Sequence, residues 1–117
     1  MEAQIDIKPI SVNRAWQGRR YKSDEYEKYE KLMLLMLPAS RLPEPPYRIY
    51  YEFGFSNKLS DYDNPIKATQ DCLQKKYGFN DNEIYEAFIR KCIAKKGKEY
   101  VKIKIEHLEM EDDGKEK

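Results

Sequence analysis

Residues that bind soft metals or form disulfides are scarce in this chain. It has two cysteines and one histidine among 117 residues. Cys72 and Cys92 have neither the spacing of metal ligands nor the density of a disulfide scaffold, so we expect buried, reduced thiols. His107 falls in a late stretch of alternating residues, which favours a strand surface or packing residue over a catalytic base. Disulfide-rich scaffolds and histidine-based catalysis are therefore disfavoured.

Long apolar runs are also missing. No stretch approaches the roughly 18 apolar residues that can span a membrane, and the N-terminus lacks the charged and then apolar pattern of a signal peptide. We therefore expect a cytoplasmic protein. Its 117 residues suffice for a single domain with a modest core. Ten tyrosines among 40% hydrophobic residues indicate that aromatic groups carry much of the packing.

The net charge of +1 hides an asymmetry along the chain. Residues 109–117 hold five acids and two lysines, a net charge of −3, which leaves +4 on residues 1–108. We interpret 109–117 as a charged, disordered tail and 1–108 as the folded domain. If four aspartates of that domain were neutralised around a metal, its remaining charge would be near +8. Such a surface suits a polyanion.

Apolar periodicity and capping residues predict an α+β domain. The expected order is β-α-β-α-β-β, over residues 3–10, 23–37, 47–55, 65–77, 84–94 and 99–108. Ser23 is a candidate N-cap of the first helix, and Gly78 can end the second in a left-handed conformation. Lys95–Lys98 has the length and glycine of a hairpin turn between the last two strands. We expect a small mixed sheet of about four strands packed by two helices.

Four carboxylates and one lysine gather where the second helix should begin. The run Asp61-Tyr62-Asp63-Asn64-Pro65-Ile66-Lys67 is followed by Asp71 and Asp81. If Tyr62 is extended, Asp61 and Asp63 point to the same side. Asn64 would cap the helix and Pro65 would occupy its first position. Lys67 and Asp71 would then share one face. Hard oxygen ligands without nearby Cys or His favour magnesium, with manganese as a substitute.

A structural explanation stands beside the metal hypothesis. Asp63 can be a turn or cap residue, Asp71 can pair with Lys67 or Lys75, and Asp81 can close a loop. Each of these explanations is adequate for one residue alone. The set is harder to explain, because four like charges near one corner repel one another unless a cation offsets them.

A basic segment precedes the first helix. Residues 11–22 combine an aromatic residue with guanidinium groups, as loops that grip phosphates or stack on bases do. The alternative is a solvated loop anchored by its tryptophan. Tyr62, between two proposed ligands, is a further candidate for contact with a substrate. The candidate DNA-binding residues are Asn13, Arg14, Trp16, Arg19, Arg20, Lys22 and Tyr62.

These residues resemble a known family. The pattern Asp-X-Asp-Asn-X-X-Lys at 61–67, Asp71 four residues later, and then Gly78-Phe79 and Asp81 resemble the RusA family of Holliday-junction resolvases, whose members are often prophage-encoded. The Ser11-Val12-Asn13-Arg14 segment is similar to that family's opening. The resemblance spans most of residues 5–107.

The resemblance implies a Mg-dependent endodeoxyribonuclease that resolves four-way DNA junctions by paired symmetric nicks during recombination and repair. It implies that Asp61, Asp63 and Asp81 bind the metal and that Lys67 is the catalytic lysine. Asp71 matches a further acidic position and is an additional candidate ligand. Many relatives have two adjacent aspartates where this chain has Asn80-Asp81, and Pro65 replaces a commoner aliphatic residue.

The family also implies a homodimer, since two opposed cuts suit two-fold symmetry. Candidate interface residues are Ile89 and Ile93, or the apolar face of 101–105, although burial inside one chain also explains them. Two alternative functions remain open. One is an inactive nucleic-acid-binding module of the same fold, and the other is a metal nuclease acting on other branched or single-stranded DNA.

Overall fold

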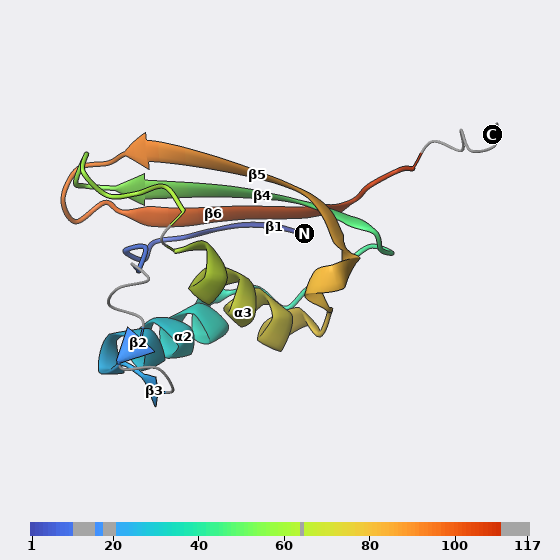
Figure 1. Ribbon diagram of the computed structural model, residues 1–117, viewed down its shortest axis with the longest axis horizontal. Helices are drawn as coiled ribbons and strands as arrows, with labels where there is room; N and C mark the ends of the chain where they lie inside the picture. The colour runs from blue at the N-terminus through green and yellow to red at the C-terminus, as the bar shows by residue number, and fades with distance from the viewer. Residues whose placement is uncertain (11–15, 18–20, 64, 111–117) are drawn as a thin grey trace.

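The computed structural model describes residues 1–10, 16–17, 21–63 and 65–110, with the backbone alone for 16, 17, 21 and 22. Its elements are β1 (Glu2–Ile5), β2 (Trp16–Gln17), β3 (Tyr21–Lys22), α2 (Asp24–Met36), β4 (Tyr47–Phe55), α3 (Ile66–Tyr77), the short 3-10 helix η1 (Asp81–Glu83), β5 (Ile84–Ile93) and β6 (Tyr100–His107). Figure 1 shows both long helices on the same side of one sheet. The predicted α+β class and element order are confirmed.

The first helix begins and is packed as the sequence predicts. The Ser23 hydroxyl accepts a hydrogen bond from the Tyr26 N–H at 3.1 Å, which caps the free N-terminus of α2. Tyr26, Tyr29 and Met33 recur at helical spacing and are buried. Met36, which the same spacing would place in the core, is 41% exposed at the end of the helix.

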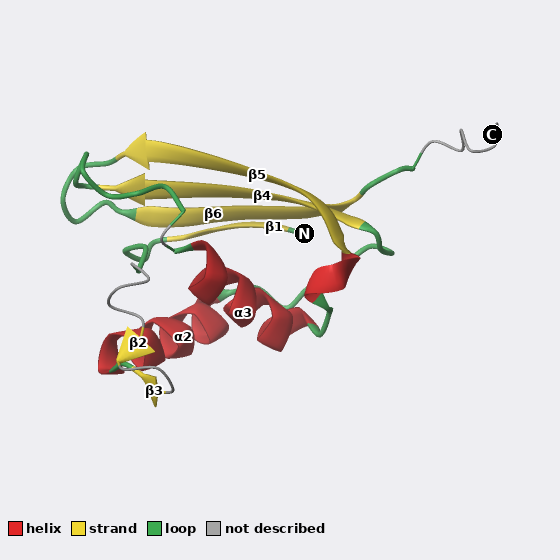
Figure 2. Cartoon of the chain, in the orientation of Figure 1, coloured by secondary structure: helices red, strands yellow, loops and turns green. Residues whose placement is uncertain are grey.

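The centre of the sheet is β4. Its alternate residues Tyr47, Ile49, Tyr51, Phe53 and Phe55 are all buried beneath the helices, as the period-two pattern predicts. Two tyrosine hydroxyls bond side chains of α3: Tyr29 of α2 shares a 2.7 Å hydrogen bond with Thr69, and Tyr51 of β4 donates to Gln70 at 3.1 Å. Figure 2 shows that the helices occupy one face of the sheet.

The predicted hairpin between the last two strands is wrong. The sheet order is β1-β6-β4-β5, so β4 lies between β5 and β6. It pairs parallel with β5 and antiparallel with β6. The residues 94–99 therefore carry the chain across the end of β4. An alternating pattern is the same whether two successive strands are neighbours or flank a third, and the buried β4 is the better partner for both.

The segment 11–22, which we predicted to be a basic loop, includes two short strands. Trp16 pairs with Lys22 and Gln17 with Tyr21 in the antiparallel β2–β3 ribbon. The predicted strand at 3–10 is shorter than expected and ends at Ile5. The tail prediction for 109–117 concerns residues that, after Met110, lie outside the described part of the chain.

Candidate nucleic-acid and metal site

The corner that carries Asp61 and Asp63 lies between β4 and α3. Asp61, Tyr62 and Asp63 are all exposed, with Tyr62 exposed to 54%. Tyr62 and Asp63 form a turn in which the Ile66 N–H donates to the Asp63 carbonyl at 3.2 Å. Tyr62 is therefore not extended, so the condition under which Asp61 and Asp63 would point to the same side is not met. A turn suits the site, because it presents both carboxylates to solvent ahead of a helix start.

The start of α3 differs by one residue from the expectation. The helix begins at Ile66, with Pro65 in the cap position and no side-chain cap hydrogen bond. Asn64, the predicted cap, lies outside the described residues. The C-terminal end of α3 agrees with the prediction. Gly78 adopts the left-handed conformation with φ 74°, and its N–H donates to the Gln74 carbonyl.

A lysine from β5 holds the loop in front of the corner. The Lys91 ammonium donates to the Lys58 carbonyl at 2.6 Å and to the Ser60 carbonyl. Inside the loop, the Asn57 side chain accepts from the Leu59 N–H at 2.8 Å. Ser60 directly precedes Asp61, so Lys91 fixes the backbone from which the two acids project. The sequence offered no signal for this contact, because it joins residues about thirty positions apart.

Lys67 and Asp71 meet on one face of α3, as their spacing predicts. The Lys67 ammonium lies 3.8 Å from Asp71 Oδ2, and the lysine side chain is 68% exposed. The Tyr26 hydroxyl donates to the same oxygen at 3.2 Å. Burial, followed by the Asp71 carboxylate, raises the pKa of Tyr26, so it stays a donor at neutral pH. Lys75, the other expected partner of Asp71, instead pairs with Glu30 at 2.7 Å.

Asp81 lies at the far end of α3. The helix has 12 residues, and at 1.5 Å per residue it separates its two ends by about 18 Å. Asp81 opens η1, where the Asn80 side chain and Glu83 cap each other's backbone groups. In Figure 1, the corner and η1 lie at opposite ends of α3. Asp81 is exposed there.

One chain therefore does not assemble the expected three carboxylates. Among the described residues, which include all four candidate aspartates, no three His, Cys, Asp or Glu side chains lie close enough to hold a metal. Asp61 and Asp63 have the oxygen donors that Mg²⁺ prefers, and within the described structure neither carboxylate has an ion-pair or hydrogen-bond partner. The donor chemistry fits a hard cation, but the geometry of a single copy does not complete the site.

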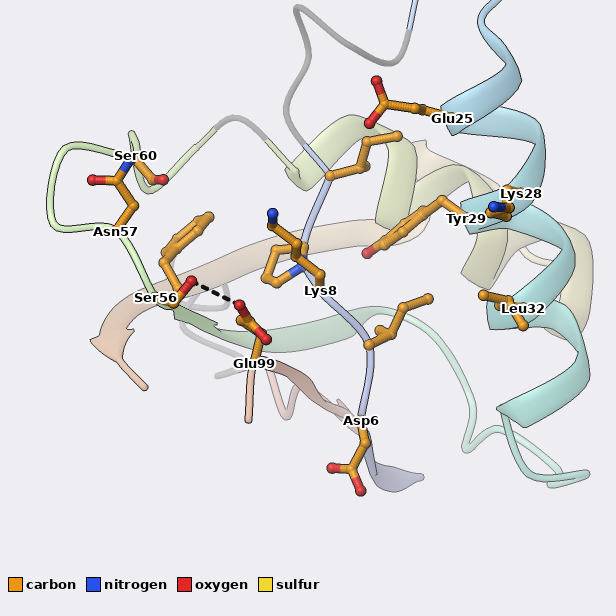
Figure 3. A pocket seen from close by; sticks show the side chains of 14 residues that line it. Asp6, Lys8, Glu25, Lys28, Tyr29, Leu32, Ser56, Asn57, Ser60 and Glu99 are labelled. Atoms are coloured by element: carbon orange, nitrogen blue, oxygen red, sulfur yellow. Dashed lines mark hydrogen bonds between the residues drawn. The ribbon is translucent and has the colours of Figure 1, made fainter. Parts of the chain in front are cut away.

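A cleft of about 690 Å³ opens beside the corner. Ser56, Asn57 and Ser60 of the loop line one side (Figure 3). Lys28 and Tyr29 of α2 lie opposite, and the segment after β1 forms the floor. A 2.7 Å hydrogen bond from the Ser56 hydroxyl to Glu99 closes its lower rim. Its lining combines charged groups of both signs with apolar side chains such as Ile10 and Phe55, and such a mixture is typical of a ligand site.

The structure describes the proposed DNA-binding residues only in part. Asn13, Arg14, Arg19 and Arg20 lie outside the described residues, and Trp16 and Lys22 are described in backbone alone. Tyr62, between the two acids, is exposed. His107 is exposed at the end of β6 and bonds the Glu44 carbonyl at 2.8 Å, which agrees with a strand-surface role. Both cysteines are free; Cys72 is buried and Cys92 is half-buried.

Comparison with known proteins identifies one family model. The model described as Endodeoxyribonuclease RusA matches residues 7–106, which is most of the chain and includes the corner, α3, η1 and β5. A search of curated proteins finds no match. No helix in the described part of the chain is long and apolar enough to cross a membrane.

Proposed function

Because the chain belongs to the RusA family of Holliday-junction-resolving endodeoxyribonucleases, we propose that it is a Mg²⁺-dependent nuclease that cuts four-way DNA junctions by paired symmetric nicks. The observation that carries the proposal is the family match over 7–106, within which Asp61 and Asp63 are exposed and their carboxylates have no partner in the described structure. Its place is the cytoplasm, where DNA recombination and repair supply the substrate.

Asp61 and Asp63 are the metal ligands of this proposal. Their carboxylates share one exposed turn and have no competing partner in the described structure. When bound, Mg²⁺ would offset charge on the phosphate oxygens and lower the pKa of a bound water. Lys67, in the first turn of α3 with a largely exposed ammonium, is placed to neutralise negative charge on the phosphodiester. Asp71 supports Lys67, and its Oδ1 remains available as an additional ligand.

Asp81 belongs to the same site only if a second copy supplies it. Its separation from Asp63 along α3 exceeds the reach of any shared cation, because Mg²⁺–oxygen distances are about 2.1 Å. A homodimer resolves this conflict when Asp81 of one copy approaches Asp61 and Asp63 of the other. The same two-fold symmetry gives two equivalent sites for two equivalent strands. The dimer is therefore part of the proposed function.

Basic residues of the chain would bind the sugar-phosphate backbone. The net charge of +4 on residues 1–108 includes the segment 11–22 with Arg14, Arg19 and Arg20. Such contacts position a nucleic acid and make binding weaken with salt. Tyr62 can stack on an unpaired base at the branch point.

The test is cleavage of a labelled synthetic four-way junction beside a linear duplex of the same sequence. We expect paired nicks on the junction with Mg²⁺ or Mn²⁺, and none with chelator. Asp63→Asn should remove cleavage and leave junction binding within a few-fold. Wild-type cleavage by this variant would overturn the assignment of Asp63, and a preference for flaps or single strands would overturn the substrate.

A second candidate, an inactive junction-binding module, is favoured by one observation. The carboxylates of a single chain do not form a metal site. This candidate predicts salt-dependent binding of the junction without a cut under any metal condition. The same assay separates the two functions.

A further inference from the structure

The turn at 57–60, between β4 and the acidic corner, is fixed by hydrogen bonds along its backbone. The Ser60 N–H donates to the Asn57 carbonyl at 3.2 Å, and the Asn57 side chain accepts from the Leu59 N–H at 2.8 Å. The carbonyls of Lys58 and Ser60 both accept from the β5 lysine that holds this loop. In Figure 1, the loop that carries the turn leaves the tip of β4 and returns toward α3. The backbone on both sides of Leu59 is therefore held in place.

The side chain that this turn presents to solvent is apolar. Leu59 is 87% exposed, the largest exposed fraction among the large hydrophobic side chains of the described residues. Turn positions usually hold Gly, Pro, Asn, Asp or Ser, whose backbone or side chain suits a tight turn. As the third residue of the turn, Leu59 contributes a backbone N–H to its hydrogen bonds, and its side chain contributes none. That side chain is therefore available for a contact outside the chain.

The surroundings of Leu59 fit a nucleic acid better than a protein partner. Lys58 is exposed directly before it, and Asp61 and Asp63 are exposed shortly after it. Protein interfaces are centred on apolar surface from which charged residues are depleted. Here the nearest other exposed apolar residue along the sequence is Tyr62, which stands between the two acids. A single apolar side chain among charges suits DNA, because an apolar wedge enters one base step while a lysine contacts a neighbouring phosphate.

We propose that Leu59 enters an unstacked base step at the branch point of a DNA junction, an inference that rests on the proposed function. Separating two stacked bases costs free energy in an intact duplex, and it costs least where stacking is already interrupted. Burial of the leucine side chain between bases offsets this cost at a branch point more readily than within a linear duplex. Leu59 is thus a specificity-determining residue whose contact favours branched over linear DNA.

The place of Leu59 in the chain connects this contact with the cut. Leu59 and Asp61 are two residues apart in sequence, so their Cα atoms lie at most about 7 Å apart. Successive base pairs of DNA are about 3.4 Å apart along the helix axis. A base step that holds Leu59 therefore lies within a few base pairs of a phosphate at the Asp61 turn. The wedge would direct cleavage to phosphates close to the branch point.

The fluorescence of 2-aminopurine tests the wedge without cleavage. The full chain is added, with chelator in place of metal, to a synthetic four-way junction that carries 2-aminopurine at the branch point, where unstacking of this base raises its fluorescence. We expect the wild type to raise the fluorescence at saturation and Leu59→Ala to lose most of that rise. Leu59→Ala should also lose about tenfold in its preference for the junction over a linear duplex, because the buried apolar contact is removed. Leu59→Met, which keeps an apolar side chain of similar size, should retain both properties.

Leu35→Ala provides the matched control. Leu35 is 78% exposed on α2, so this substitution removes the same side chain from a comparably exposed position. We expect it to show the fluorescence rise and the junction preference of the wild type. Both leucines are exposed, so neither substitution should impair folding. Wild-type behaviour of Leu59→Ala, or equal losses in both variants, overturns the proposal.

Fluorescence and cleavage together separate the wedge from the proposed nuclease function. A chain that unstacks the branch point through Leu59 but cuts no junction with Mg²⁺ would overturn the nuclease function and leave the wedge intact. A chain that cuts junctions without any rise in fluorescence would overturn the wedge alone, and a chain that does not bind the junction would overturn both. If Leu59→Ala instead altered the mass of the protein in solution and left the fluorescence unchanged, Leu59 would contact another protein chain, which also overturns the wedge.

Discussion

Lys67 is the residue whose environment most directly suggests a role in charge neutralisation. Its ammonium lies 3.8 Å from Asp71, longer than the 2.7–2.9 Å typical of a charge-assisted hydrogen bond, so its charge is only partly offset. Asp71 is itself fixed by the Tyr26 hydroxyl, which keeps the pair on one side of α3. The pair therefore keeps Lys67 near the Asp61 turn and leaves the N–H groups of its ammonium able to donate to a substrate.

We predict that Lys67→Gln lowers junction cleavage by about 10²–10³-fold, because a preorganised cation that stabilises developing charge contributes that much. Binding of the junction should change by only a few-fold, since one phosphate contact is a small share of the total. Single-turnover cleavage and a separate binding titration measure the two effects. Lys102→Gln, on the open face of the sheet, removes the same charge elsewhere and should retain cleavage. Equal rates for both variants would show that Lys67 is only a surface residue.

Lys91 connects a strand with a loop that is distant in sequence. It links the end of β5 to the loop that leads into the Asp61 turn, through hydrogen bonds to two backbone carbonyls. A displacement of about 1 Å at a catalytic group can cost two orders of magnitude in rate. These hydrogen bonds thus make the positions of Asp61 and Asp63 depend on β5.

Lys91→Met keeps much of the side-chain volume and removes both donors. We expect cleavage at saturating junction to fall about 10–100-fold, with the junction dissociation constant and the dimer mass nearly unchanged. Lys91→Arg, which retains donors, should recover part of the rate. If Lys91→Met instead lost rate and binding equally, the lysine would act in DNA contact and not in positioning the loop.

The local features of helices and strands could be predicted from the sequence, but the pairing of strands could not. The Ser23 cap, the Gly78 stop and the alternation of β4 depend on neighbours in sequence, and the structure confirms each of them. The pairing of β5 and β6 depends on β4, which an alternating pattern cannot reveal, so the hairpin prediction was wrong. The acidic motif was visible as a set of residues, and the predicted helix over 65–77 already separates Asp63 from Asp81 by about 18 Å, so the expectation that one chain brings them together did not take the helix length into account.

The buried tyrosines make the packing of helices on the sheet sensitive to alkaline pH. Burial raises the pKa of Tyr29 and Tyr51 above the ordinary value of 10.0. Their neutral forms are favoured in the folded chain, so above pH 10 the unfolded chain loses protons first. The stabilisation is complete below pH 10 and is lost as the pH rises toward the folded-state pKa.

We therefore expect the free energy of unfolding to fall between about pH 10 and 11, with each such tyrosine adding up to about 1.4 kcal/mol per pH unit. Urea unfolding across this range measures the slope. Tyr51→Phe removes one ionisable group and should make the slope shallower, while Tyr85→Phe, at an exposed position, should leave it unchanged. A steeper slope for Tyr51→Phe than for the wild type would contradict the burial argument.

At the scale of the whole molecule, the function depends on whether one site draws on two chains. Asp63→Asn and Asp81→Asn should each abolish cleavage as homodimers. In a mixed dimer, one site combines the intact Asp61 and Asp63 of the second variant with the intact Asp81 of the first, and the other site carries both substitutions.

Mixing the two inactive variants should therefore restore cleavage, as single nicks without the symmetric partner cut. At equal concentrations about half of the dimers are mixed, so we expect up to about a quarter of the wild-type nicking rate, because each mixed dimer has one working site of two. Pre-equilibrating the variants before adding the junction, and assaying each variant alone at the same total concentration, provide the controls. If each site instead lay within one chain, every site in the mixture would retain one substitution. The mixture would then stay as inactive as its components, since no rearrangement of subunits could bring together an intact set of ligands.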